Sequence, residues 1–387
     1  MGGEADTTAL DPNGAGPGAG PGRGPAGART RLPAETFRLP VDKLRAGYYS
    51  DAYFNHAKAL LEDEGRHPHV LMQVFQRRHS ILGGIDEALA VLEQSSGRLH
   101  PDGRWISGWD ELRVRALHEG DEVEPWETVL TIEGDYTLFA HLETVYLGCL
   151  ARRSLIMRNV REVVDAAQGK PILYFPARHD HWRVQTGDGW AAHVAGVIGV
   201  STDAQASWWG GRGVGTVPHA LIAAYGGDTV SAARAFARRF ADEMRVTVLV
   251  DFENDSVNTA VGVADALGAG LWGVRLDTSD ALADRALVER HGAAAPKGVV
   301  PELVDLVREA LDAAGHPEVR IVVSGGFDAE RIRAFEALGV PVDAYGVGSS
   351  LIRGSNDFTA DIVLCDGLPC AKVGRRHNSN ERLSLVR

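Results

Sequence analysis

Residues 320–350 read RIVVSGGFDAERIRAFEALGVPVDAYGVGSS, and this stretch decides the fold class. The apolar run RIVV leads into a glycine turn and a segment with helical spacing, and a second apolar run then ends in another glycine turn. Strands that are apolar throughout and are followed by helices belong to parallel sheets buried on both faces. The stretch therefore predicts two strands of an α/β fold joined by a helix.

The same alternation extends back along the chain to about residue 156. The apolar runs PILYF, HVAGVIGV, RVTVLVD and LWGVRLD alternate with segments of helical spacing, several of which close on glycine as helix C-termini prefer. Six or seven such units without a GxGxxG fingerprint at the first favour a closed or nearly closed α/β barrel over an open doubly wound sheet. We expect this barrel at residues 156–355.

The chain before the barrel divides into a tail and a β-rich domain. Residues 1–33 include GAGPGAGPGRGPAGA, which has almost nothing to bury, so we expect a disordered tail. Residues 34–155 mix strand-like runs with turn signals such as EGD and IEGD. This pattern predicts short antiparallel strands in a first domain.

Composition restricts the function class. The net charge of the 387 residues is −12, which repels polyphosphate backbones and argues against nucleic acid as a partner. No run is long and apolar enough for a membrane span, and no signal peptide is recognisable. Three cysteines are too few for a disulfide framework, so we expect a cytoplasmic protein. Cys365 and Cys370, with His377, form an incomplete zinc set, and we interpret them as packing residues.

Two glycine turns at the last predicted strands indicate a phosphate site. In α/β barrels the reactive groups lie at the carboxyl ends of the strands, and phosphate is commonly bound after the last two. The turns SGGFDAER and YGVGSSL occupy those positions. Glycine lets the backbone approach an anion, and the N–H groups of a following helix point at it. A lone glycine turn would more often be structural, but two in tandem favour phosphate binding.

Carboxylates follow two other predicted strands. Asp251 and Asp277 end the runs VLVD and RLD, and Arg275 lies two residues before Asp277. Carboxylates beside a phosphate suggest bound Mg²⁺ or contacts with sugar hydroxyls. For Asp255 and Asp280 we favour capping of the following helices.

The segment YFPARHDHW contributes an aromatic ring and a cation. Phe175 could be a core residue, but at a strand end it could also stack on a flat ring, and Arg178 could bind an anion. His179 and His181 have HxH spacing without an evident third ligand, so a metal site is not favoured there. His219, which follows Pro218 at a predicted helix start, would by itself be interpreted as structural.

Taken together and in order, these motifs resemble the nicotinate phosphoribosyltransferase family. The ordered set covers nearly everything after residue 36 and comprises SDAY, VFQRR, ALHEGDEVEPWETVLTIEG, YFPARHDH, GVSTDA, GTVPH, VLVD, RLDTS, VVSGGFD and YGVGSSL. The resemblance implies a β-rich α+β sandwich joined to an irregular α/β barrel, with the segment 356–387 returning to the first domain. It also implies homodimers in which the sandwich of one subunit lies over the barrel mouth of the other.

The resemblance further implies an activity. Nicotinate and phosphoribosyl pyrophosphate would give nicotinate mononucleotide and pyrophosphate with Mg²⁺, in NAD salvage. Positive charge grows on the ribose ring while negative charge grows on the leaving group, so catalysis would consist mostly of alignment and charge stabilisation.

The family's functional positions carry over to individual residues of this chain. The 5′-phosphate loops match Gly325, Gly326, Gly346, Gly348, Ser349 and Ser350. Asp251 and Asp277 match catalytic positions near ribose, metal and pyrophosphate. The pyridine would lie between Phe175 and a partner-derived Tyr53. The pocket for the carboxyl substituent matches Arg275, Thr247 and Ser201. Arg178 matches the phosphoribosyl site, and Arg77 and Arg78 are candidates for pyrophosphate from across the dimer.

The resemblance changes the interpretation of His219. It matches the histidine that relatives phosphorylate with ATP, so it becomes a candidate catalytic residue and phosphohistidine. ATP is therefore an expected co-substrate.

Three alternatives remain open at the level of sequence. A nicotinamide-using relative carries an acid where this chain has Ser201, and an acid would receive an amide N–H but repel nicotinate, so Ser201 favours the acid substrate. A quinolinate enzyme would need a denser basic pocket. The third alternative is an inactive nucleotide-binding scaffold. Pro176 favours it, because relatives commonly carry glycine at this position.

Overall fold

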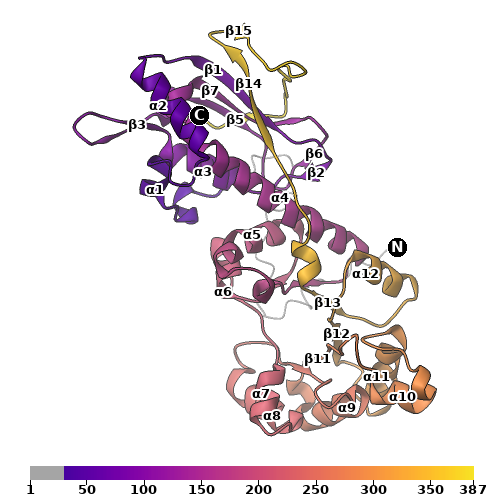
Figure 1. The fold of residues 1–387 in the computed structure, drawn as a ribbon. Helices are drawn as coiled ribbons and strands as arrows, with labels where there is room; N and C mark the ends of the chain where they lie inside the picture. Colours follow the sequence, from indigo (N-terminus) through magenta and orange to yellow (C-terminus); the bar gives the residue numbers. More distant parts are fainter. Residues whose placement is uncertain (1–29) are drawn as a thin grey trace. The chain divides into compact units, whose positions relative to one another are not determined.

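The computed structural model describes residues 30–387, which divide into two compact units (Figure 1). The barrel unit comprises residues 159–353, and the N-terminal unit comprises residues 30–158 and 354–387. The boundary falls inside the long helix α4 (Glu143–Ala166). Most of the predicted tail, residues 1–29, lies outside the described residues. Its last residues are described, and there Arg31 Nη1 donates to Asp86 Oδ1 at 2.8 Å.

The N-terminal unit is built around a six-stranded antiparallel sheet. The sheet order is β15-β14-β1-β7-β5-β16. The strands are β1 (His69–Phe75), β5 (Arg113–Ala116), β7 (Thr128–Asp135), β14 (Thr359–Cys365), β15 (Leu368–Pro369) and β16 (Ser384–Leu385). Three of these strands come from the C-terminal segment, which pairs with β1 and β5. The C-terminal segment therefore completes a sheet that the first domain begins.

Helices and short hairpins complete this unit. They are α1 (Val41–Arg45), α2 (Ala52–Asp63), α3 (Ile85–Ser95), and the strand pairs β2 (Ser80–Ile81) with β6 (Glu122–Val123) and β3 (Gly97–Leu99) with β4 (Trp105–Ser107). Helix α3 buries most of its residues, whereas α2 buries none. The core of this unit includes Phe139 and Tyr146, and they pack with apolar residues of α3, β1 and β7.

The barrel unit contains a six-stranded parallel sheet, ordered β10-β11-β12-β13-β8-β9. The strands are β8 (Ile172–Tyr174), β9 (Gly199–Val200), β10 (Thr247–Leu249), β11 (Gly273–Leu276), β12 (Arg320–Val323) and β13 (Ala344–Val347). The helices that follow them are α5 (Gln185–Ala195), α6 (Asp203–Ala206), α7 (His219–Ala224), α8 (Thr229–Phe240), α9 (Ser256–Leu267), α10 (Arg285–His291), α11 (Pro301–Ala313) and α12 (Ala329–Ala337). The predicted mixed α/β class is confirmed.

The parallel sheet is curled, and one extended segment reaches both of its outer strands. The N–H of Val214 donates to the carbonyl of Val200, the last residue of β9, at 2.7 Å. Three residues on, the N–H of Val217 donates to Thr247 at 2.9 Å and Val217 bridges Val248 in parallel. Strands β8, β10 and β13 are buried along their whole length, as the sequence predicts for strands covered on both faces.

The predicted helix caps at Asp255 and Asp280 are not found in the barrel unit. Asp255 occupies the N-cap position of α9 without a side-chain cap bond, and Asp280 lies four residues before the N-cap of α10. Asp284 does the capping instead. Its buried carboxylate accepts from the N–H of Ala286 at 3.0 Å and from the N–H of Ser256 at 2.9 Å. One buried acid therefore satisfies the first turns of two helices, which explains why neither predicted cap is required.

No helix within residues 30–387 combines the length and apolar character that a membrane span requires.

Candidate active site

The predicted site residues of the barrel unit gather at the carboxyl ends of its strands. Phe175, Ser201, Asp277 and Gly348 each directly follow a strand, and Asp251 lies two residues after the end of β10. Ser324, which was not among the predicted site residues, directly follows β12. Because all six strands are parallel, these ends lie at the same edge of the sheet. Ligands of parallel α/β folds bind at this edge. The sheet therefore places an aromatic ring, hydroxyls, carboxylates and glycine turns around one region.

His219 is paired with Asp251. Its Nε2 lies 3.0 Å from Asp251 Oδ1, and the side chain of His219 is 42 % exposed while that of Asp251 is 7 % exposed. The hydrogen bond to Asp251 raises the pKa of His219, against partial burial, which lowers it. When Nε2 carries the proton toward Asp251, Nδ1 holds a lone pair. The pair thus orients an accessible histidine with one nitrogen available for chemistry.

Arg275 is held in a buried network with Ser324 and Asp277. Its Nε donates to Ser324 Oγ at 2.7 Å, and Ser324 Oγ donates to Asp277 Oδ1 at 2.7 Å. Arg275 Nη2 lies 3.6 Å from Asp277 Oδ2, and Nη1 lies 3.4 Å from Thr216 Oγ1. Burial lowers the pKa of Arg275, whereas the neighbouring carboxylates raise it. The guanidinium is therefore fixed in place by Ser324, Asp277 and Thr216.

The ring of Phe175 lies against this guanidinium. The distance from Arg275 Cζ to the ring centroid is 5.1 Å. A Cβ at Gly346 would lie 2.8 Å from Phe175 Cε2, so a glycine is needed where β13 passes the ring. A flat ligand with a negative substituent would find an aromatic surface and a cation side by side here.

The first glycine turn has a backbone conformation that glycine adopts readily. Gly325 and Gly326 have φ values of +87° and +72°, a region that favours glycine. Arg331 Nη1 donates to the carbonyl of Gly325 at 2.8 Å, and its Nη2 donates to that of Val299 at 2.6 Å. Because the C=O and N–H of one peptide plane point in opposite directions, Arg331 turns the N–H of Gly326 away from itself.

The second turn is tied to the first. Ser350 Oγ donates to the carbonyl of Phe327 at 2.9 Å, and Ser349 Oγ accepts from Arg353 at 3.3 Å. A Cβ at Gly348 would lie 3.1 Å from His179 Cε1. The two predicted phosphate loops are therefore neighbours, which the sequence alone did not establish.

Three other predicted residues of this unit have different surroundings. Arg178 is exposed on the turn after Phe175, close enough to lower the pKa of Arg275. Ser201 hydrogen bonds to Gln205. Thr247 begins β10, and the threonine hydroxyl near Arg275 is that of Thr216. The structure thus does not bring Thr247 together with Arg275 through a hydrogen bond.

The remaining predictions fall in the N-terminal unit. Tyr53 lies on α2 with 61 % of its surface exposed, and its hydroxyl contacts Asp51 at 3.4 Å. Arg77 and Arg78 follow β1, and the Arg77 guanidinium lies 5.8 Å from the centroid of Trp126. These residues are accessible within their own unit.

Metal-ligand clusters are absent from the part of the chain that the structure describes. Residues 30–387 contain no group of three or more His, Cys, Asp or Glu side chains arranged to hold an ion. Cys365 and Cys370 are free thiols.

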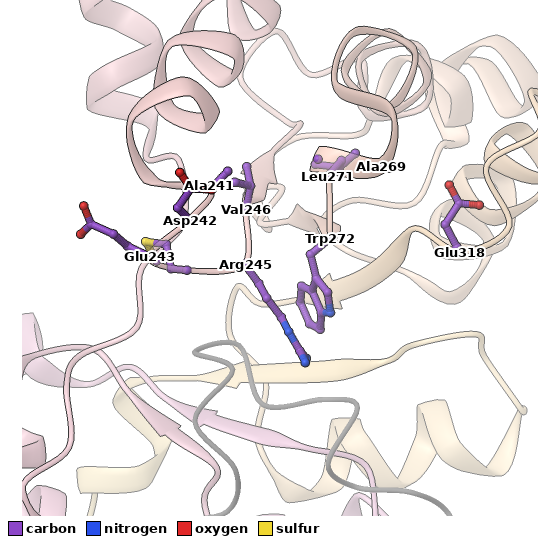
Figure 2. Close-up of a pocket in the computed structure, with 11 residues that line it drawn as sticks. Ala241, Asp242, Glu243, Arg245, Val246, Ala269, Leu271, Trp272 and Glu318 are labelled. Atoms are coloured by element: carbon purple, nitrogen blue, oxygen red, sulfur yellow. The ribbon is translucent and has the colours of Figure 1, made fainter.

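A cavity of about 470 Å³ lies at the opposite ends of the barrel strands (Figure 2). Residues 241–246, 269–272 and Glu318 line it, and these precede β10, β11 and β12. Figure 2 shows the Arg245 side chain beside the Trp272 indole, and the guanidinium lies 5.9 Å from the ring centroid. The cavity is therefore separate from the carboxyl ends of these strands, which Asp251 and Asp277 follow.

Sequence reasoning missed four residues that hold the site together. Ser324, Thr216, Arg331 and Gln205 bind Arg275, a glycine carbonyl or Ser201. The position of Ser324 directly after a strand was an available signal. Nothing local marked the other three.

Comparison with known proteins gives concordant results. The family model described as the quinolinate phosphoribosyl transferase N-terminal domain matches residues 51–154. A nicotinate phosphoribosyltransferase of Mycobacterium tuberculosis is 30 % identical over 355 residues, covering 84 % of this chain and 74 % of that protein. The Bacillus subtilis nicotinate phosphoribosyltransferase is 24 % identical over 328 residues, covering 79 % and 63 %.

Two solved structures are also similar. The nicotinate-nucleotide pyrophosphorylase of Pyrococcus furiosus is 33 % identical with a TM-score of 0.74, covering 90 % of this chain and 85 % of that one. The human nicotinic acid phosphoribosyltransferase shares the fold, with 18 % identity, a TM-score of 0.66, and coverage of 85 % and 77 %.

Proposed function

The chain belongs to the nicotinate phosphoribosyltransferase family, and on that premise we propose that it forms nicotinate mononucleotide and pyrophosphate from nicotinate and phosphoribosyl pyrophosphate, in NAD salvage. The observation that carries the proposal is the Arg275 guanidinium beside the Phe175 ring, at the strand edge that also holds both glycine turns. A flat carboxylic acid and a sugar phosphate are the ligands that this combination suits.

In the proposed reaction, the site aligns the pyridine nitrogen with C1 of the ribose. The pyridine stacks on Phe175, its carboxylate meets Arg275, and the 5′-phosphate accepts N–H groups of the glycine turns, including Gly326. The pyridine nitrogen then forms a bond to C1 of ribose as the bond from C1 to the pyrophosphate oxygen breaks. The carboxylates of Asp251 and Asp277 stabilise the positive charge that grows on the ribose ring.

Mg²⁺ is part of the proposal. Asp251 and Asp277 would hold it, and Mg²⁺ commonly uses one or two carboxylates together with substrate phosphates, so a cluster of three protein ligands is not required. When bound, the ion neutralises charge on the leaving pyrophosphate. Asp277 also accepts from Ser324, which limits its freedom to move.

ATP use through His219 is a further part of the proposal. With its Nε2 proton on the side of Asp251, the Nδ1 lone pair would attack the terminal phosphorus of ATP, and ADP would leave. Water would later release the phosphate from the histidine. The support is the orientation of an accessible imidazole by a nearly buried carboxylate.

We also infer a homodimer with shared sites and an irregular barrel. The exposed Tyr53 would cover the pyridine from one subunit while Phe175 lies below it in the other, and Arg77 and Arg78 would reach pyrophosphate. The contacts of Val214 with Val200 and of Val217 with Val248 support barrel closure.

The direct test is incubation of the purified protein with nicotinate, phosphoribosyl pyrophosphate and Mg²⁺, with and without ATP. We expect nicotinate mononucleotide and pyrophosphate in equal amounts, with a higher yield when ATP is present. No mononucleotide under either condition would overturn the proposal and favour a nucleotide-binding scaffold.

Quinolinate is the second candidate substrate, because residues 51–154 match the N-terminal domain model of quinolinate phosphoribosyl transferase. Quinolinate carries two carboxylates, and its conversion to the same mononucleotide releases carbon dioxide. The charged groups that act on Arg275 are two acids, Asp277 and Asp251, and one further cation, Arg178, which suits one substrate carboxylate better than two. Replacing nicotinate by quinolinate in the same assay and measuring carbon dioxide separates the two.

A further inference from the structure

The hydroxyl of Ser201 is already committed to a neighbour. Ser201 follows β9, and both its backbone N–H and its Oγ contact Gln205 Oε1, at 3.0 Å and 3.1 Å. Gln205 lies on α6 and is only 1 % exposed. The contact is therefore internal to the protein.

The backbone bond fixes which atom of the amide faces Ser201. A backbone N–H can only donate, so the atom it meets is the amide oxygen and not the NH₂ group. An amide oxygen can only accept, so the second contact must use the hydroxyl proton of Ser201. A hydroxyl has one proton. Ser201 consequently has only lone pairs left for any further partner.

Ser201 and Phe175 directly follow two neighbouring strands. Strand β8 pairs in parallel with β9, and Tyr174 is the partner of Val200. Phe175 and Ser201 are the residues that directly follow this last pair, so both leave the sheet at the same edge. A pyridine stacked on Phe175 would have its substituent within reach of Ser201 if the proposed function holds.

We propose that Gln205 is a positioning residue that makes Ser201 a hydrogen-bond acceptor toward the ring substituent. The inference rests on the proposed function. A carboxylate has no proton to give an acceptor, whereas a carboxamide has two, so nicotinate is bound through Arg275 and not through Ser201. Discrimination against the amide then depends on Arg275 alone, and nicotinamide binds the wild-type site as a competitive inhibitor.

The first experiment removes the hydroxyl. In Ser201→Ala, the Ki for nicotinamide should rise about tenfold relative to the KM for nicotinate, because the oxygen that accepts the amide N–H is removed. A Ser201 that donates to nicotinate would give the reverse, a higher nicotinate KM. That reversal, or a wild-type enzyme that nicotinamide does not inhibit, would overturn the inference.

The second experiment changes Gln205 in two directions. The measured quantity is the ratio of the nicotinate KM to the nicotinamide Ki. Gln205→Met keeps the side-chain volume and frees the Ser201 proton, so this ratio should fall by about tenfold. Gln205→Glu keeps an oxygen for both bonds and adds negative charge, so the same ratio should rise. If both substitutions only disturbed the packing of the site, the ratio would change in the same direction in both variants or stay unchanged. Either result contradicts the inference.

The controls separate this inference from the proposed function. In a Ser201→Ala background, Gln205→Met should leave the ratio unchanged, because no hydroxyl remains to be freed. Gln185→Met removes another glutamine that binds a neighbouring hydroxyl, that of Thr202 at 2.9 Å, and should not change the ratio. Failure of the proposed function shows differently, as no product from nicotinate with the wild-type protein.

Discussion

At the scale of single residues, the site depends on side chains that orient one another. Asp251 orients His219, Ser324 joins Arg275 to Asp277, and Arg331 holds the carbonyl of a glycine turn. Each of these bonds fixes the direction in which a reactive or binding group points. Two of them lead to separate predictions.

Asp251→Asn should return the pKa of His219 toward its ordinary value. The pKa is raised in the folded protein, chiefly by the bond to Asp251, so the His219–Asp251 pair stabilises the fold below the ordinary histidine pKa. This stabilisation is lost as pH rises through the raised value. Titration of the ring nitrogens by NMR measures the shift. An unchanged His219 curve in the variant would show that Asp251 does not set its protonation.

Arg331→Lys should weaken phosphoribosyl pyrophosphate binding while leaving nicotinate binding unchanged. A lysine cannot hold the carbonyls of Gly325 and Val299 together, so the Gly326 N–H loses its direction. We expect the KM for phosphoribosyl pyrophosphate to rise about tenfold, measured by steady-state kinetics.

Arg333→Lys is the matched control on the same helix. Arg333 pairs with Glu162 at 3.2 Å in an exposed ion pair, which contributes little. Equal changes in both variants, or a selective rise in the nicotinate KM, would argue against a role of Arg331 in the phosphate loop.

At the scale of elements, the packing of α5 against α6 positions Gln205. A Cβ added at Gly189 in α5 would lie 2.2 Å from the carbonyl oxygen of Gln205. The two helices can be this close only because residue 189 has no side chain. The close packing at Gly189 therefore fixes the backbone of Gln205, whose side chain binds Ser201.

Gly189→Ala should therefore destabilise the protein by about 1–3 kcal/mol or more, because the backbone of α6 must move. Denaturant unfolding followed by circular dichroism measures the free energy of unfolding. Gly148→Ala is the control, since Gly148 lies exposed in α4 with nothing within 4 Å of an added Cβ. That variant should be neutral or more stable by about 0.5–1 kcal/mol. Similar losses in both variants would refute close packing as the cause.

At the scale of the whole molecule, the proposed sites draw on two units and two subunits. Tyr53 belongs to the N-terminal unit and Phe175 to the barrel unit. If each site combines Tyr53 of the partner subunit with Phe175 of the first, two inactive variants should complement one another. We expect Tyr53→Ala and Phe175→Ala to be nearly inactive alone and to recover partial activity when mixed and reassembled.

Sedimentation of the mixture, together with its rate of mononucleotide formation, checks this prediction. Mixed assembly without recovered activity would contradict a shared site, since a mixed dimer contains one site with both aromatic residues intact. A monomer with full wild-type activity would contradict it as well.

The family resemblance and the α/β class were both predictable from the sequence, and both are confirmed. The apolar runs identified the parallel strands, because buried strands must be apolar on both faces. The residues directly after them, among them Phe175, Asp277 and Gly348, could be placed at one edge for the same reason. The caps were predicted wrongly at Asp255 and Asp280, because Asp284 reaches both helix starts.

The sequence by itself therefore determined where the apolar strands end and which of them are followed by glycine-rich turns, since both can be read from local periodicity and residue type. Only the tertiary structure decided which of these residues bind one another. Arg275 meets Ser324 across 49 positions of the chain, and Ser256 meets Asp284 across 28. Such pairs depend on how neighbouring parallel strands and helices align after long crossovers, and no local pattern encodes that alignment.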